Sequence, residues 1–79
     1  MVRIDLHGLT LDAALSEVDR EVNHNFIQEV DDRRIEFVTG WGDVLRPGVR
    51  EYLAEHPLVK ELRTDGASLR ILLEDLQGD

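Results

Sequence analysis

Apolar and polar residues alternate in three short segments, and this alternation limits the folds that the chain can adopt. Successive side chains of a strand point to opposite faces of a sheet, so each segment predicts a strand with one buried face. The apolar positions are Val2, Ile4 and Leu6, then Ile35 and Phe37, and finally Leu69, Ile71 and Leu73. Strands covered on both faces would instead be continuously apolar, so we expect two layers and a sheet with one face open to water.

Two amphipathic helices are predicted between these strands. Thr10 is the expected N-cap of the first helix, whose apolar residues recur at spacings of three and four: Leu11, Leu15, Val18, Val22 and Phe26. Its acidic residues Glu17, Asp19 and Glu21 are expected on the solvated face. The second helix is predicted from about Val44 to Glu55, with Pro47 near its first turn, and Gly48 in its interior indicates close packing.

The last part of the chain predicts a strand over residues 58–64, a turn at "DGAS" and the strand at 69–74. The element order is therefore β-α-β-α-β-β, and the predicted fold class is α/β, an α+β two-layer sandwich with both helices on one face. A chain of 79 residues with 42% hydrophobic content forms one core, so residues 1–79 are expected to be a single domain.

Charge and composition restrict the function. Seventeen acidic and nine basic residues give a net charge of −8, which repels nucleic acid, so any such binding must be local and weak. The absence of cysteine excludes disulfides and thiolate metal sites. No apolar run is long enough to cross a bilayer, so we expect a cytoplasmic protein with no membrane partner.

The segment "IDLHG" places Asp5 and His7 on the polar side of the first strand, at its carboxyl end. Ligands bind at that end of open α/β sheets. A carboxylate can orient an imidazole or bind a metal, and the imidazole can transfer protons near neutral pH. The alternative is a solvated Asp5 and a His7 that hydrogen-bonds the turn before Gly8.

The segment "TGWGDVLR" is the second candidate, a turn with Gly40 and Gly42 that leads into the second helix. Its backbone amides suit a phosphate, and Arg46 could bind one through two parallel hydrogen bonds. Trp41 could stack on a nucleobase or fold back onto the edge of the core. The alternative is a simple tight turn in which Asp43 is the helix N-cap and Arg46 a surface residue.

Together, "IDLHGLTLDAAL", "FVTGWGDVLRPGVREYLAEHPLVKELR" and the strand after "DGAS" resemble the Smr (small MutS-related) domain family over nearly the whole chain. Members are described as nucleic-acid-binding and nicking endonucleases, alone or in larger proteins. Where many members have a lysine after the first glycine of the second motif, this chain has Trp41.

The resemblance implies a mixed four-stranded sheet with two helices, similar to the C-terminal domain of bacterial translation initiation factor three. It implies catalytic roles for Asp5, His7 and Arg46. The nucleic-acid-binding residues that the motifs indicate are Gly8, Thr39, Gly40, Trp41, Gly42 and Arg46.

Two functions remain open at this point. The first is a DNA or RNA endonuclease, for which the need of a metal such as Mg²⁺ or Mn²⁺ is undetermined. The second is a non-catalytic module that binds nucleic acid or a protein partner, alone or within a larger parent chain.

Overall fold

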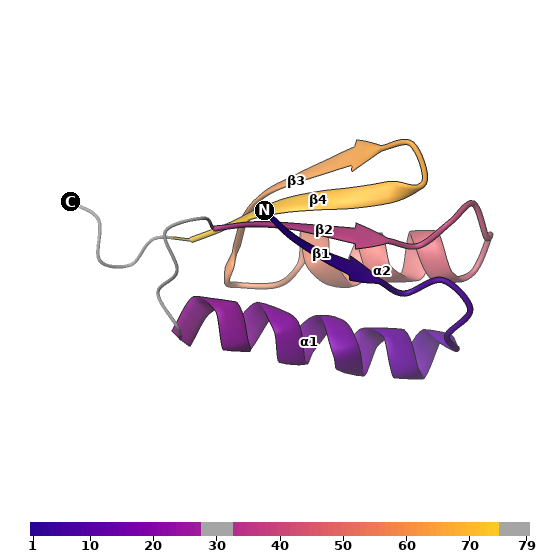
Figure 1. Cartoon of the computed structure of the whole chain (residues 1–79), viewed down its shortest axis with the longest axis horizontal. Helices are drawn as coiled ribbons and strands as arrows, with labels where there is room; N and C mark the ends of the chain where they lie inside the picture. The colour runs from indigo at the N-terminus through magenta and orange to yellow at the C-terminus, as the bar shows by residue number, and fades with distance from the viewer. Residues whose placement is uncertain (28–32, 75–79) are drawn as a thin grey trace.

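Four strands and two helices make up the computed structural model, which describes residues 1–27 and 33–74 (Figure 1). In chain order they are β1 (Val2–Asp5), α1 (Leu11–Ile27), β2 (Arg34–Val38), α2 (Leu45–Ala54), β3 (Val59–Asp65) and β4 (Ser68–Leu73). The β-α-β-α-β-β order predicted from the sequence is confirmed. Within the described ranges, no helix has the length and apolar character that a membrane span requires.

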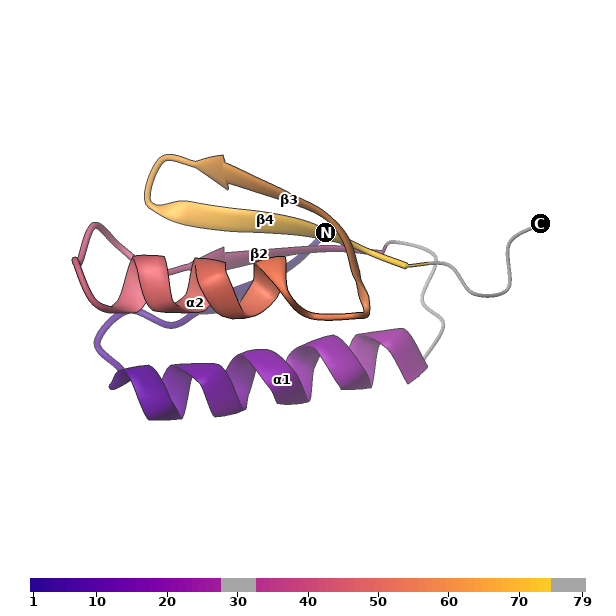
Figure 2. The same ribbon diagram turned by 180° about the vertical axis from the view of Figure 1, so that it is seen from behind.

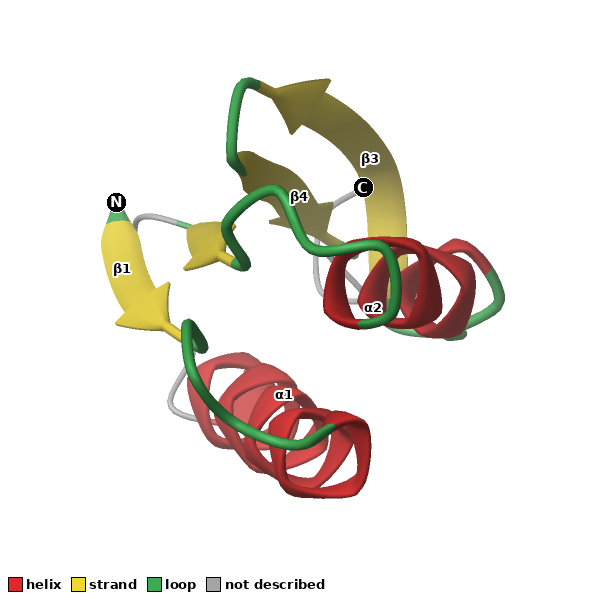
Figure 3. Ribbon diagram, turned by 90° about the vertical axis from the view of Figure 1, so that its right-hand side faces the viewer, coloured by secondary structure: helices red, strands yellow, loops and turns green. Residues whose placement is uncertain are grey.

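The sheet is mixed, with the strand order β1-β2-β4-β3. β1 is parallel to β2, and β4 is antiparallel to both of its neighbours, so β1, β2 and β3 all run in one direction. Both helical crossovers therefore proceed the same way along the sheet, which places α1 and α2 on the same face. The end-on view in Figure 3 shows both helices on one side of the strands, as predicted.

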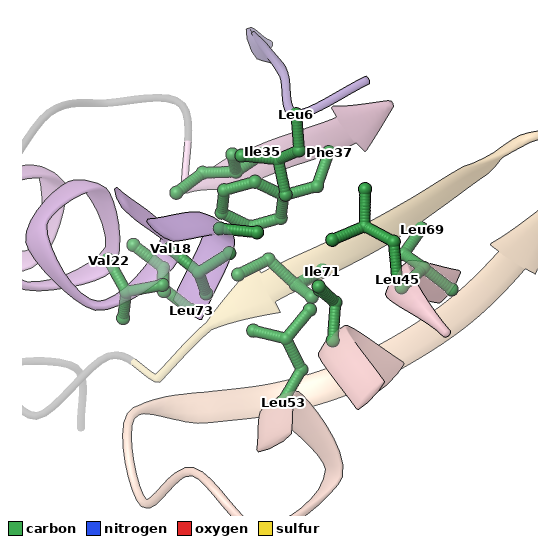
Figure 4. Packing of buried hydrophobic residues seen from close by; sticks show 12 residues of the cluster. Leu6, Val18, Val22, Ile35, Phe37, Leu45, Leu53, Leu69, Ile71 and Leu73 are labelled. Atoms are coloured by element: carbon green, nitrogen blue, oxygen red, sulfur yellow. The ribbon is translucent and has the colours of Figure 1, made fainter. Parts of the chain in front are cut away.

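The core lies between the helices and the covered face of the sheet (Figure 4). Ile35 and Phe37 of β2 are almost completely buried, whereas Arg34, the first residue of this strand, is exposed on the open face. The buried apolar residues are Leu6, Ala14, Val18, Val22, Ile35, Phe37, Leu45, Val49, Leu53, Leu69, Ile71 and Leu73. The alternation in the sequence thus predicts correctly which face is buried.

The two helices begin differently. Thr10 caps α1, because its Oγ1 accepts a hydrogen bond of 3.2 Å from the backbone N–H of Ala13, as predicted. At α2 the N-cap position belongs to Val44, which has no side-chain cap bond and already has helical dihedrals (φ −103°, ψ −51°). The interpretation of Asp43 as the N-cap is therefore wrong: the helix begins one residue later, beyond the usual reach of that carboxylate.

Gly48 lets α1 and α2 approach closely. A Cβ added at Gly48 would lie 2.6 Å from Cδ1 and 3.0 Å from Cδ2 of Leu11, well inside normal contact. The close packing that the sequence indicated at this glycine is therefore present, and its partner is the first residue of α1.

Gly48→Ala is expected to bring no net stability in the wild-type background, although alanine is favoured over glycine in a helix by about 1 kcal/mol. The displaced Leu11 offsets that gain. In a Leu11→Ala background the same substitution should stabilise the fold by roughly 1 kcal/mol, measured as the free energy of unfolding in urea. If Gly48→Ala stabilised the wild-type protein by the same amount as the Leu11→Ala variant, the contact between Gly48 and Leu11 would have no effect on stability.

Candidate nucleic-acid interface

Three loops meet at the edge of the sheet where β1, β2 and β3 end. The turn between β3 and β4 supplies the carbonyl of Ala67, which accepts hydrogen bonds of 3.0 Å from the amides of both Thr39 and Gly40. The hydroxyl of Thr39 lies 3.0 Å from the carbonyl of Gly40 and 3.3 Å from that of Ala67. Because Thr39 is only 3% exposed, it anchors the loop after β2 rather than presenting its hydroxyl to a ligand.

Asp5 and His7 shape the loop after β1. Oδ1 of Asp5 accepts a hydrogen bond of 2.9 Å from the backbone N–H of His7, and the amide of Leu9 donates to the carbonyl of Leu6 at 3.1 Å. Gly8 completes this turn at φ +87°. Both Asp5 and His7 are exposed, but no hydrogen bond joins their side chains, so the carboxylate holds the turn rather than the imidazole.

The side chain of His7 brings the first sequence motif close to Gly40 of the second. A Cβ built at Gly40 would lie 3.6 Å from Cδ2 of the imidazole, so the ring lies on the side of Gly40 where a side chain would project. Gly40 has φ +78°, a conformation that residues with a side chain rarely adopt. The exposed imidazole is thus next to the loop that the sequence predicted as a phosphate site.

Trp41 and Arg46 form a stacked pair at the tip of that loop. The guanidinium carbon of Arg46 lies 5.0 Å from the centroid of the indole, within the range of a cation–π contact. Nη2 of Arg46 also donates to the carbonyl of Gly66 at 3.2 Å. Trp41 remains 70% exposed, so it does not fold back onto the core, and most of its ring is available to a ligand.

Arg50 is a basic residue of this surface that our interpretation of the sequence omitted. It lies one helical turn after Arg46, and its Nε donates to Oγ1 of Thr64 at 3.3 Å. Both arginines line a shallow hollow of about 370 Å³, together with Trp41, Gly42, Asp43, Pro47 and Thr64. The spacing of four between Arg46 and Arg50 is the signal that could have identified the second arginine.

The backbone of the loop supports an anion site. Among the described residues, the amides of Trp41, Gly42 and Asp43 have no hydrogen-bond acceptor, and they precede the N-terminus of α2. Unpaired amides at a helix N-terminus favour negative charge. The exposed carboxylate of Asp43 opposes it, so the local balance in the hollow is two guanidinium groups against one carboxylate.

The geometry around Asp5 allows only a sparsely coordinated metal. Within residues 1–27 and 33–74, no three histidines or carboxylates lie close enough together to hold an ion. Mg²⁺ is, however, commonly bound by one or two carboxylates together with substrate phosphates and water. One oxygen of Asp5 accepts the His7 amide, and the carboxylate is exposed, so a site of that kind fits the residues present.

A second polar cluster lies on the other flank of α2, facing α1. The hydroxyl of Tyr52 donates to Oδ1 of Asp19 at 2.6 Å, and Nε2 of His56 lies 3.4 Å from the same oxygen. Nδ1 of His56 accepts the backbone N–H of Leu58 at 3.1 Å, which leaves the proton on Nε2, toward Asp19. Asp19 was expected on a purely solvated face; it instead joins the two helices.

This cluster changes how two of its members titrate. The Tyr52 hydroxyl lowers the pKa of Asp19, with a smaller contribution from His56. Burial and the hydrogen bond to Asp19 raise the pKa of Tyr52 to about 12. The Tyr52 contribution to stability is therefore complete below about pH 10 and is lost as the pH rises toward 12. The Asp19 contribution is complete above its ordinary pKa and is lost in more acidic solution.

Tyr52 is the only tyrosine of the chain, so its ionisation can be followed directly by absorbance at the phenolate band. We expect a midpoint near pH 12 while circular dichroism reports a folded protein. In Asp19→Asn the midpoint should fall but stay above that of free tyrosine, because burial is the larger cause. An unchanged midpoint in Asp19→Asn would mean that the hydrogen bond has no effect on the phenol.

Comparison with known proteins gives one family and one architecture. Residues 4–68 match the family model described as Smr domain. The crystal structure of the Smr domain of Thermus thermophilus MutS2 is similar to this chain, with a TM-score of 0.86 and 23% sequence identity. The alignment covers 95% of this chain and 100% of the other, so the two share a fold. A comparison with curated proteins gave no match.

Proposed function

The chain belongs to the Smr domain family, known for nucleic-acid binding and nicking, and on that premise we propose that it binds a nucleic-acid strand and cleaves its backbone. The observation that carries the proposal is the proximity of the His7 ring to Gly40, which puts a group able to transfer protons beside the loop with the unpaired amides. The proposal needs both motifs, because the first supplies the group for proton transfer and the second supplies the loop for phosphate binding.

Binding would rest on the hollow at the start of α2. A nucleobase stacks on the exposed part of Trp41, whose other contact is Arg46. The phosphates lie near the free amides of the loop and near Arg46 and Arg50. This local group of donors acts against the net charge of −8 at short range. Because only two guanidinium groups line the hollow, affinity is expected to fall only modestly as salt is added.

Cleavage would be hydrolysis of a phosphodiester. The imidazole of His7 accepts a proton from a water molecule, and the water oxygen forms a bond to phosphorus. The bond from phosphorus to the leaving oxygen breaks, and that oxygen takes a proton from solvent. Arg46 and the loop amides stabilise the charge that develops on the other phosphate oxygens. A Mg²⁺ or Mn²⁺ ion bound by Asp5, when present, would polarise the phosphate.

The proposal is tested by nicking of supercoiled plasmid and of single-stranded RNA, each with Mg²⁺, with Mn²⁺ and with EDTA. The comparison protein is the Asp5→Ala/His7→Ala double variant, with circular dichroism to verify that it is folded. Cleavage by the wild type alone supports the nuclease, and the substrate and metal that permit it define the reaction. Equal cleavage by both proteins means that the activity comes from other residues or from a contaminant.

A second function is favoured by one specific observation. Asp5 holds the backbone amide of His7 and not its ring, so the imidazole has no orienting carboxylate among the described residues. A domain built in this way can bind a strand without cutting it. Strand binding that depends on Trp41 and Arg46, with no cleavage under any metal condition, would favour this non-catalytic module.

A further inference from the structure

A groove runs between the two helices, on the side of the molecule away from the open face of the sheet. α1 and α2 lie side by side and run in the same direction (Figure 2). The groove between them has a volume of about 770 Å³ and shares no residue with the hollow at Trp41. Residues of α1, of α2 and of the segment that follows α2 line it.

The floor of this groove is apolar. Leu11, Leu15 and Leu58 are half-buried: each packs on the core with part of its side chain and leaves the rest facing the groove. Leu11 is also held against Gly48, so its position is fixed by the helix contact described above. An apolar side chain entering the groove would remove the remaining surface of these leucines from water.

The rim is acidic. Glu51 of α2 and Glu55, the C-cap residue of that helix, lie about one turn apart and are both exposed. Neither forms an ion pair or a side-chain hydrogen bond within the described part of the chain. Asp19 faces them from α1, where Tyr52 holds its carboxylate. Among residues 1–27 and 33–74, no lysine or arginine lines the groove, so these described residues do not compensate its charge.

The two flanks of α2 therefore differ in sign. Arg46 and Arg50 face the hollow beside β3, whereas Glu51 and Glu55 face the groove beside α1. An acidic groove repels the phosphate backbone, so it is not a continuation of the nucleic-acid interface. A second copy of this chain also has a net charge of −8, so the acidic groove would repel it.

We propose that this groove receives a basic, amphipathic helical segment of a partner protein. Leucine-like side chains at helical spacing would enter the apolar floor, and lysines or arginines beside them would pair with Glu51, Glu55 and Asp19. Along α1 the groove extends from Leu11 to Asn23, which is roughly 18 Å of helix and matches a segment of about 12 residues.

The test uses a fluorescein-labelled 12-residue peptide of leucine and lysine at helical spacing, and a second peptide in which every lysine is replaced by glutamate. Saturable binding of the basic peptide is expected, measured by anisotropy, with amide NMR shifts at Leu15, Tyr52 and Leu58. Glu51→Lys/Glu55→Lys should weaken it at least tenfold. The control Glu61→Lys/Asp65→Lys changes the net charge equally on β3, away from the groove, and should leave the affinity unchanged.

Several results would overturn the proposal. These are equal binding of the acidic peptide, an equal loss in the control variant, or NMR shifts confined to the sheet or to the loop at Trp41. Concentration-dependent shifts of the groove residues without peptide would show that a second copy is the occupant. Because Glu51 and Glu55 are exposed, their replacement leaves the core intact, and circular dichroism verifies the fold of each variant. Nicking activity enters none of these readouts, so the outcome is independent of the proposed reaction.

Discussion

His7→Ala is expected to lower the nicking rate by a factor on the order of 10² to 10⁴, the usual loss when a general base is removed. The imidazole is exposed, so its removal is expected to leave the core and the fold intact. The rate is measured as the conversion of supercoiled plasmid to open circle under single-turnover conditions. Strand affinity, measured separately, should change little, because the imidazole is assigned to the chemical step.

His24→Ala is the matched control, since His24 is an exposed histidine in the last turn of α1, far along the helix from the loops at its start. It should nick at the wild-type rate. Free imidazole added to His7→Ala should restore part of the activity if the residue acts as a base. A His7→Ala protein as active as the wild type would remove His7 from the mechanism and leave Asp5 and Arg46 without their proposed partner.

Trp41→Ala should weaken binding to a single-stranded oligonucleotide by roughly 5- to 150-fold, which corresponds to the 1–3 kcal/mol that one base–aromatic stack contributes. The indole is 70% exposed and has no role in the core, so the loss is one of contact and not of folding. The affinities of the wild type and of Trp41→Ala are both measured from the anisotropy of a labelled oligonucleotide. In the wild type, Trp41 is the only tryptophan, so its fluorescence reports the same binding event directly.

Trp41→Phe separates stacking from other effects of the substitution. Phenylalanine keeps an aromatic face, so this variant should retain most of the affinity, whereas Arg46→Ala should reduce the dependence of binding on salt. Equal affinity of the wild type and Trp41→Ala would place the strand elsewhere, for example on the open face of the sheet, where Arg3, Arg34 and Arg70 are exposed.

Local patterns were sufficient for the elements and their faces. Ile35 and Phe37 alternate with charged residues and are buried, and Thr10 caps α1 through its hydroxyl. Gly48 was recognisable as a close approach because glycine is unfavourable inside a helix. What periodicity could not give is the partner of that glycine, since the contact with Leu11 joins residues far apart in the chain.

The candidate site was predictable as two motifs at one edge of the sheet, but the hydrogen bonds that hold it were not. The sequence indicated that Asp5, His7 and the loop at Gly40 lie at carboxyl ends of strands, and the structure places them at one edge. The sequence did not indicate that the carbonyl of Ala67 holds that loop. Every residue has a backbone carbonyl, so the residue type does not reveal which carbonyl accepts a hydrogen bond. Asp19 was misjudged for a similar reason: the helix pattern marks it as polar but cannot show Tyr52 opposite it.

The position of β4 has a consequence for biosynthesis. This strand follows the other three in the chain but lies between β2 and β3, and the carbonyl of Ala67 just before it holds Thr39 and Gly40. A nascent chain that has emerged only as far as α2 has an unpaired edge on β2 and Phe37 without its neighbour Leu69. The loop at Gly40 therefore reaches its final shape only once the ribosome has released residues up to Leu73, well after the loop itself has been translated.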